Sequence, residues 1–336
     1  MGLTHKISLI LIPALCFLLS LFLGRYPVDA GTLLRVIVSK VCFFLPLEQT
    51  WSDTVEVVLF RIRLPRALMA LLVGASLSIS GASFQGMFHN PLVSPYLLGV
   101  SSGAGFGAAL ALIMNLPAAG IQGLAICLGI AAVTITYMIS RVSGQTPKLM
   151  LVLSGVVVSS LFMALISLLK YVADPYDKLP AIVFWLMGSL GDAKLEDILT
   201  AAPLMGSGIA GLLLLRWRIN LLSMGEREAR AMGVNAELLK KAVILCSTLI
   251  SAAAVSVSGI VGWVGLVIPH ICRMWVGPDH RLLLPASLST GAAYLLLIDN
   301  LARTLTPAEI PLGILTAIIG APFFAFLLRR SQGGWM

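Results

Sequence analysis

Apolar runs of about 20 residues recur along the whole chain, and short polar segments separate them. A helix of this length crosses the ~30 Å hydrocarbon core of a lipid bilayer. The pattern predicts spans at residues 7–23, 64–87, 95–114, 117–139, 149–169, 195–215, 242–261, 282–298 and 310–328. A shorter apolar piece at 262–275 contains Pro269 and predicts a short or broken helix. With this piece counted, the sequence predicts an all-α polytopic membrane protein of about ten helices.

The composition agrees with a single membrane domain over residues 1–336. The chain is 58% hydrophobic and only 11% charged, and no polar block is long enough to form a soluble domain. A signal peptide is an alternative interpretation of the run at 7–23, but the candidate cleavage site at 28–30 is poor, so we expect a retained helix. The apolar piece at 181–190 is too short to span and predicts a half-helix or a surface helix.

The largest polar island lies at 216–241 and contains six Lys or Arg and three Glu. Ser223 followed by Glu226 matches a capping box and predicts a helix start. Gly233 then predicts a left-handed stop, and Asn235 predicts a second start. A short charged helix cannot lie in hydrocarbon, so it lies on the membrane surface or against another protein. A solvated loop is the simpler interpretation, but capping at both ends favours a docking helix for a soluble partner.

The basic residues on the two sides of the membrane indicate the orientation of the chain. With ten crossings, the side that holds both termini carries 13 Lys or Arg and the other side carries 10, which together make the 23 of the chain. Short loops rich in Lys and Arg face the cytoplasm, so we expect both termini and the polar island there. The net charge of +8 does not indicate nucleic-acid binding, because no basic run with interleaved aromatic residues occurs.

Ionisable residues are almost absent from the middle of the predicted spans. A charge at the bilayer centre costs roughly 2.5–3.5 kcal/mol and is retained where an ion or proton must pass. Their absence argues against a proton-coupled carrier and against an ion filter made of charged rings. The sequence also lacks a GxxxxGK[ST] nucleotide loop, an HExxH motif and a catalytic triad, and its five cysteines have no metal-ligand spacing. We therefore expect no cofactor, no metal and no enzymatic activity in this chain, and an energy source on another subunit.

Short motifs in a fixed order cover nearly the whole chain after the first span. They lie at 63–68 (RLPRAL), 89–92 (HNPL), 98–105 (LGVSSGAG), 224–233, 262–273, 279–285, 299–303, 309–313 (EIPLG) and 320–322 (GAP). In this order they closely resemble the FecCD family. Members of that family are the permease subunits of ABC importers for iron–siderophore complexes, haem and cobalamin.

The resemblance implies a homodimer with about ten helices in each subunit and a translocation pathway at the interface. Two cytoplasmic ATPase subunits, which bind ATP and Mg²⁺, would dock on coupling helices at about 218–240. The residues expected in this contact are Ser223, Gly225, Glu226, Ala229, Arg230 and Gly233. A soluble periplasmic or extracellular binding protein would deliver the substrate, and its acidic residues would meet Arg63, Arg66 and Arg303. Snorkelling to the membrane edge is the simpler interpretation of the arginines near residue 63.

The resemblance also implies that the spans at 149–169 and 310–328 line most of the pathway. Small and polar residues in these spans are the candidates: Ser154, Ser159, Ser160, Gly313 and Thr316. Ordinary hydrogen bonding between helices is an equally open interpretation of the serines. The resemblance places the cytoplasmic gate near four consecutive residues: Gln145, Thr146, Pro147 and Lys148.

The sequence therefore predicts the permease of an ATP-driven importer in the cytoplasmic (inner) membrane of a bacterium or archaeon, in contact with lipid. An iron chelate, either a siderophore complex or haem, is the expected cargo, and cobalamin and molybdate or tungstate are the alternatives. A stand-alone secondary carrier is the alternative of another class. Similar Ser-x-Ser-Gly segments at 78–81 and 256–259 hint at the inverted repeats that many carriers share. A membrane-embedded enzyme is a third alternative, which no catalytic cluster supports.

Overall fold

Helices make up nearly all regular structure in the computed structural model, which describes residues 3–41, 51–142 and 145–330. Within these ranges the only strand-like feature is one bridge between Val142 and Gln145. Six helical stretches are long and apolar enough to cross a membrane: 53–88, α6 (Ala118–Ser140), α7 (Lys148–Val172), α9 (Leu195–Leu222), α11 (Ala236–Ser258) and α13 (His280–Thr304). The shorter apolar helices are α1 (Leu3–Phe22), α5 (Val100–Ile113), α8 (Lys178–Met187), α12 (Val264–Val276) and α14 (Leu312–Arg330). The predicted all-α polytopic membrane fold is confirmed.

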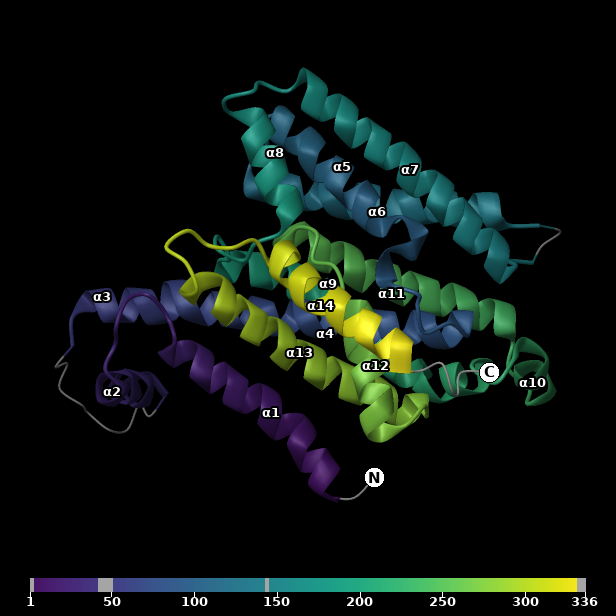
Figure 1. Cartoon of the computed structure of the whole chain (residues 1–336), viewed down its shortest axis with the longest axis horizontal. Helices are drawn as coiled ribbons and strands as arrows, with labels where there is room; N and C mark the ends of the chain where they lie inside the picture. Colours follow the sequence, from purple (N-terminus) through teal and green to yellow (C-terminus); the bar gives the residue numbers. More distant parts are fainter. Residues whose placement is uncertain (1–2, 42–50, 143–144, 331–336) are drawn as a thin grey trace.

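The central helix of the bundle is α4 (Leu64–Phe88), which is buried along most of its length (Figure 1). It packs against α9, α11, α12 and α13. Glycines allow the backbones to approach closely: a Cβ atom on Gly74 would lie 2.2 Å from the carbonyl oxygen of Gly291, and one on Gly81 would lie 1.8 Å from that of Gly265. Small residues are the usual means of close helix contact in membranes, where apolar burial gives no preference for helix over lipid.

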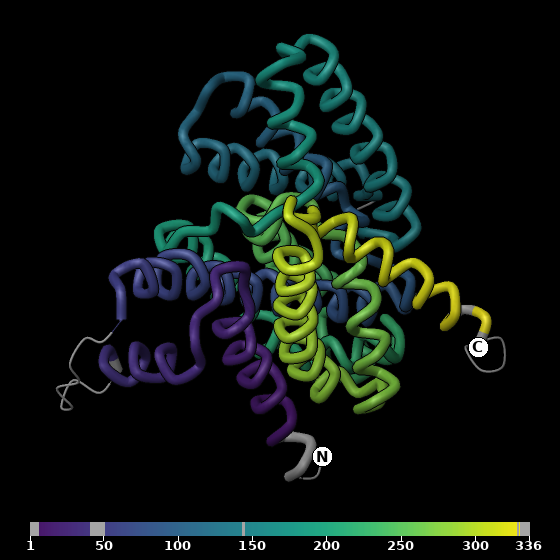
Figure 2. The backbone as a smooth tube through the Cα atoms, turned by 60° about the vertical axis from the view of Figure 1, so that its left-hand side comes forward, coloured from purple at the N-terminus to yellow at the C-terminus, as the bar shows by residue number. Residues whose placement is uncertain are grey.

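The other helices lie on two sides of this centre. Helix α5 packs against α6, α7 and α8 to form a group of four, whereas α1 packs against α13 (Figures 1 and 2). Helix α14 contacts α8, α12 and α13. Both α7 and α14 present exposed apolar side chains at the outside of the protomer, among them Leu153, Val157, Leu161, Ile314 and Ile318.

The two ends of the bundle differ in their polar segments (Figure 1). One end, called the α10 end below, contains α10 (Glu226–Ala231), the turn after α4, and residues 145–148 before and at the start of α7. The opposite end, called the α8 end, contains α8, the first turn of α9, and residues 305–311 between α13 and α14. A further helix, α2 (Ala30–Val41), follows α1.

The second predicted span is longer than expected at its beginning. Helix α3 (Asp53–Glu56) and a π-helical segment, η1 (Val57–Arg63), continue directly into α4, so one helical stretch covers 53–88. Pro65 lies near the start of α4 and has no N–H group to bond the carbonyl four residues before it. The wider π-helical turns therefore lie where the regular bonding pattern is interrupted.

The third predicted span, 95–114, is divided into two helices. A 3₁₀ segment, η2 (Pro95–Leu98), ends at Gly99, where φ is +89°, and α5 begins at the next residue. This backbone conformation favours glycine. Gly99 therefore marks the break within the predicted span.

The predicted N-cap of the helix in the polar island, Ser223, is wrong by two residues, since the N-cap of α10 is Gly225. Helix α9 continues to Leu222, and Ser223 is its C-terminal cap, with a hydroxyl that donates to the carbonyl of Asn220 at 2.7 Å. The hydroxyl is thus already used by the preceding helix and cannot cap the following one. Helix α10 instead begins after Gly225, whose φ is +146°.

The later signals in the same island are confirmed. Gly233 has a φ of +78° and ends the α10 turn. Asn235 is the N-cap of α11, and its side-chain oxygen accepts a hydrogen bond from the backbone N–H of Leu238 at 3.0 Å. The two helices at this end are therefore separated by a fixed turn of few residues.

Candidate functional site

The α10 end carries a short helix that lies between two glycines with positive φ, Gly225 and Gly233. The side chain of Ala229 is fully buried and fixes α10 to the core beside α9 and α11. Arg230 forms an ion pair with Glu226 at 3.7 Å and stays half exposed. Five of the six residues predicted for ATPase coupling therefore lie on α10 or beside it, and Ser223 belongs to the end of α9.

Exposed apolar side chains flank α10. Met224 is 68% exposed, Met232 64% and Leu238 64%, and the charged residues Arg227 and Glu228 lie between them. Two acidic and two basic residues in a six-residue helix are not compatible with hydrocarbon. Exposed apolar side chains near charged residues, outside the lipid, are typical of a protein contact. The sequence analysis did not identify these three apolar residues.

Lys240 joins the predicted coupling helix to the predicted gate. Its side chain is 3% exposed, and its Nζ atom lies 2.9 Å from a carboxylate oxygen of Glu237 and 3.4 Å from one of Glu226. The same Nζ donates to the backbone carbonyl of Thr146 at 2.9 Å. The hydroxyl of Thr146 donates to Glu237 and lies 3.4 Å from the hydroxyl of Tyr137. Three segments of the chain thus meet at one buried ammonium group.

The first residue of α7 is held by a second polar contact. The Nζ atom of Lys148 lies 3.0 Å from Nδ1 of His89, and Nε2 of His89 contacts the carbonyl oxygen of Leu222. An ammonium group has only donors, so Nδ1 accepts and Nε2–H donates to the end of α9. Of the other gate candidates, Pro147 precedes α7 as its N-cap and Gln145 is exposed.

An ionic network lies at the α8 end. The guanidinium group of Arg66 lies 2.9 Å from Asp299 and 2.8 Å from Glu309, and its side chain is only 6% exposed. Arg303 lies 3.9 Å from Asp299 and donates to the backbone carbonyl and the hydroxyl of Ser20. Burial raises the pKa of Glu309, but the hydrogen bond and the charge of Arg66 outweigh it, so this pKa lies below its ordinary value.

Arg63 is also buried but forms no part of this network. It donates to the carbonyl oxygens of Leu21, Phe22 and Tyr26, and it passes so close to Gly24 that a Cβ atom there would lie 2.6 Å from its Nη2 atom. The three arginines predicted to face a binding protein therefore point into the protomer, and none of them is available at its surface. Arg61, two residues before Arg63, is exposed.

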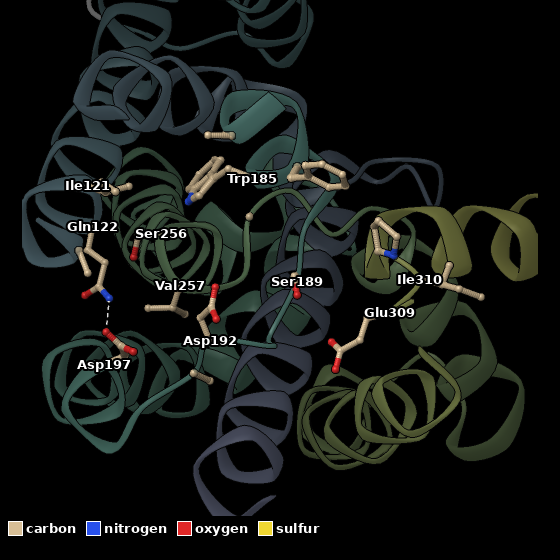
Figure 3. Close-up of a pocket in the computed structure, with 16 residues that line it drawn as sticks. Ile121, Gln122, Trp185, Ser189, Asp192, Asp197, Ser256, Val257, Glu309 and Ile310 are labelled. Atoms are coloured by element: carbon tan, nitrogen blue, oxygen red, sulfur yellow. Dashed lines mark hydrogen bonds between the residues drawn. The ribbon is translucent and has the colours of Figure 1, made fainter. Parts of the chain in front are cut away.

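A cavity of about 480 Å³ opens at the α8 end. Figure 3 shows three carboxylates around it: Asp192 before α9, Asp197 in the first turn of α9, and Glu309 before α14. Gln122 of α6 donates to Asp197 at 2.6 Å, and the ring of Trp185 from α8 forms part of the wall. Sequence analysis missed these lining residues, because they come from segments far apart in the chain and no single motif contains them.

The residues predicted for the pathway do not line this cavity. Thr316 is fully buried and donates to the carbonyl of Gly313 at 3.2 Å, and Gly313 packs against the backbone of Met187. Ser154 is buried, whereas the exposed hydroxyl of Ser160 donates to a carbonyl in its own helix. The remaining candidate, Ser159, is half-buried. The five therefore lie along α7 and α14, whose exposed faces remain open to a second protomer or to lipid.

Comparison with solved structures and known proteins extends this description. A chain described as an inward-facing conformation of a metal-chelate type ABC transporter superposes with a TM-score of 0.86 at 41% sequence identity, covering 98% of this chain and 100% of that one. The molybdate import system permease protein MolB of Haemophilus influenzae is 43% identical over 333 residues, which are 98% of this chain and 96% of that protein. An iron chelatin transport system permease protein of Helicobacter pylori is 46% identical over 281 residues, or 84% and 85% of the two chains.

The family model of the FecCD transport family matches residues 10–330, which is almost the whole length of the chain. The match includes both polar ends described above, the α10 end and the α8 end. The multi-pass helical fold and the relatives agree with this assignment. The chain belongs to the FecCD transport family, whose members are the permease subunits of ABC importers.

Proposed function

We propose that two copies of this chain form the pathway of an importer that carries an iron chelate across the cytoplasmic membrane of a bacterium or archaeon. The observation that supports this cargo is the cavity at the α8 end, where Asp192, Asp197 and Glu309 contribute carboxylates and Trp185 an aromatic wall. Carboxylates repel a compact dianion. An aromatic wall offers contact to an organic chelator such as a siderophore or to the haem ring.

Energy comes from two separate ATPase subunits that bind ATP and Mg²⁺ and dock at the α10 end. The exposed apolar residues Met224, Met232 and Leu238 around the charged α10 support this contact, because exposed apolar groups outside the hydrocarbon are typical of a protein contact. The permease itself then performs no chemistry. It alternates between access from either side as the ATPases close and open.

The homodimer is supported by the exposed apolar faces of α7 and α14. Residues such as Leu161, which is 55% exposed, and Ile318, which is 62% exposed, would be covered by the second copy or by lipid. The pathway between the two copies would then run beside Ser154, Ser159, Ser160, Gly313 and Thr316.

The α10 end faces the cytoplasm together with both termini, as the distribution of Lys and Arg between the two sides predicts. The α8 end then faces the binding protein. The buried arginines Arg63, Arg66 and Arg303 hold this end in shape, and the acidic residues of the binding protein meet exposed basic groups such as Arg61. In this revised hypothesis the three buried arginines do not touch the binding protein themselves but stabilise the surface on which it docks.

Molybdate is a second candidate cargo, because the Haemophilus influenzae permease named for it matches this chain over 98% of its length. Cobalamin stays an alternative on the family resemblance. A decisive experiment reconstitutes the permease with its ATPase in vesicles and supplies the binding protein loaded in turn with a ferric siderophore, haem, cobalamin or molybdate. Uptake of an iron chelate alone, and only with ATP, supports the proposal. ATP-dependent uptake of molybdate alone overturns the cargo, and uptake without ATP or ATPase overturns the importer in favour of a secondary carrier.

A further inference from the structure

Lys240 is a buried cation at the point where three segments of the α10 end meet. Its ammonium group has three N–H donors and no acceptor. Three different partners surround it: Glu226 on α10, Glu237 on α11, and the carbonyl of Thr146 in the segment that leads into α7. The neighbouring Lys241 is exposed. Two adjacent lysines thus differ completely in environment, although the sequence pattern treats them as equivalent.

Glu226 and Lys240 give α10 a direct polar route to the segment at 145–148, beside the contact of Lys148 with His89 and the end of α9. Helix α10 packs against α9 and α11 through the buried Ala229, and glycines with positive φ lie on both sides of it. Such a helix can tilt on its flanking turns more easily than it can deform. A tilt moves Glu226, and Glu226 contacts Lys240.

The distances from Lys240 to its three partners are unequal. The Nζ atom of Lys240 lies 2.9 Å from both Glu237 and the Thr146 carbonyl, but 3.4 and 3.5 Å from the two oxygens of Glu226. Lys240 is therefore bound firmly to α11 and to the segment before α7, and more loosely to α10. The long side chain of lysine, with four methylene groups, follows a moving carboxylate without breaking its other contacts.

We infer that Lys240 is the positioning residue that ties the position of α10 to that of residues 145–148, and so links the ATPase contact to the gate. This inference rests on the proposed function for its biological meaning, but the mechanical link it describes is a property of the permease alone. A merely structural ion pair would stabilise the α10 end without correlating the two segments.

The test measures ATP-dependent uptake per ATP hydrolysed in the reconstituted complex, with whichever of a ferric siderophore, haem, cobalamin or molybdate the vesicles accumulate. Lys240→Met should lower this ratio about tenfold, within the usual range of coupling between two sites of a protein. The matched variant Lys241→Met should leave it unchanged. Lys240→Arg, which keeps the charge and can reach the same carboxylates, should lose less than half of it. An unchanged ratio in Lys240→Met, or equal losses in the Met and Arg variants, would overturn the inference.

A second readout does not depend on transport. Spin labels at Arg227→Cys on α10 and Gln145→Cys before α7, with the native cysteines replaced, report the distance between the two segments. Lys240→Met should broaden that distribution, and Lys241→Met should not. Glu226→Gln removes only the α10 side of the bridge and should broaden it as well, which covers the case in which Lys240→Met does not assemble. Identical distributions would refute the link, whereas absent transport by the unmodified complex would refute only the proposed function.

Discussion

Arg66 and Asp299 are 233 positions apart in the chain, yet their side chains form a close ion pair: Nε of the arginine lies 2.9 Å from Oδ1 and 3.0 Å from Oδ2 of the aspartate, and Nη2 lies 2.9 Å from Oδ1. Neither side chain is more than 6% exposed. The pair joins the start of α4 to the end of α13, the two helices that pack most closely in the bundle. Removing one partner of a buried pair of this kind strongly destabilises the folded protein, because the remaining charge has no water to solvate it.

Loss of one charge from this pair should destabilise the permease more than loss of an exposed charge nearby. We expect Arg66→Met to lower the free energy of unfolding by about 3–5 kcal/mol, the usual cost of leaving one member of a buried ion pair without its partner. Arg61→Met, at an exposed position on the same helical stretch, should have a small effect. Thermal unfolding of the detergent-purified protein measures both. Equal midpoints for the two variants would contradict the assignment of Arg66 to the stabilising network.

Glu309 gives this end a defined response to acid. Its pKa in the folded protein lies below the ordinary value because Arg66 holds the charged form. A lowered folded pKa means that the stabilisation is present above the ordinary pKa of about 4.3 and is lost as the pH falls through the lower, folded value. The midpoint difference between the unmodified protein and Glu309→Gln should therefore be constant near neutral pH and shrink in acid. Glu196→Gln, at an exposed carboxylate, is the control. A midpoint difference that grows in acid would show that the pKa of Glu309 is not lowered in the folded protein.

Helices α4 and α12 lie so close together that one added methyl group between them should destabilise the protein. Gly81→Ala would place a Cβ atom 1.8 Å from the carbonyl oxygen of Gly265, so the helices must separate. Overpacking of this kind costs about 3 kcal/mol. Gly123→Ala on α6 is the matched control, since nothing lies within 4 Å of its Cβ position and alanine is the better helix former. Yield and thermal midpoint of the purified protein should fall for the first variant only. A normal midpoint for Gly81→Ala would mean that α4 and α12 are less closely packed.

The helices and much of the α10 end could be predicted from the sequence, because the signals for them lie in neighbouring residues. Spans follow from runs of apolar residues, and the left-handed Gly233 and the cap at Asn235 are signals that depend on a few neighbours. The same local reasoning failed at Ser223, because two helices compete for one hydroxyl and the sequence does not say which helix obtains it. The extent of a helix is decided by such competition.

The arginines and the cavity could not be derived from the sequence in the same way. Arg66 is recognisable as part of a motif. Only the fold brings Asp299 and Glu309 next to it, so its burial in an ion-pair network could not be read from the motif. The cavity combines Gln122 with Asp197 in the same manner, across 75 positions. Motifs therefore identified the family, whereas the environment of each charged side chain depends on contacts between distant segments.

Gly233 offers a test of the α10 contact that changes no side-chain interaction. Its φ is +78°, and no atom lies within 4 Å of a Cβ atom built on it, so the cost of a substitution is confined to the backbone. A β-branched residue is strained in this conformation by about 1–2 kcal/mol, whereas asparagine visits it routinely. Gly233→Val should therefore shift the turn that orients α10 and weaken capture of the ATPase subunit up to about tenfold. Gly233→Asn should bind nearly as well as the unmodified permease. Pull-down of the purified ATPase over a range of concentrations measures both. Equal affinities for the two variants would show that the ATPase does not require the orientation of α10, and would direct attention to Met224 and Leu238 as the primary contact.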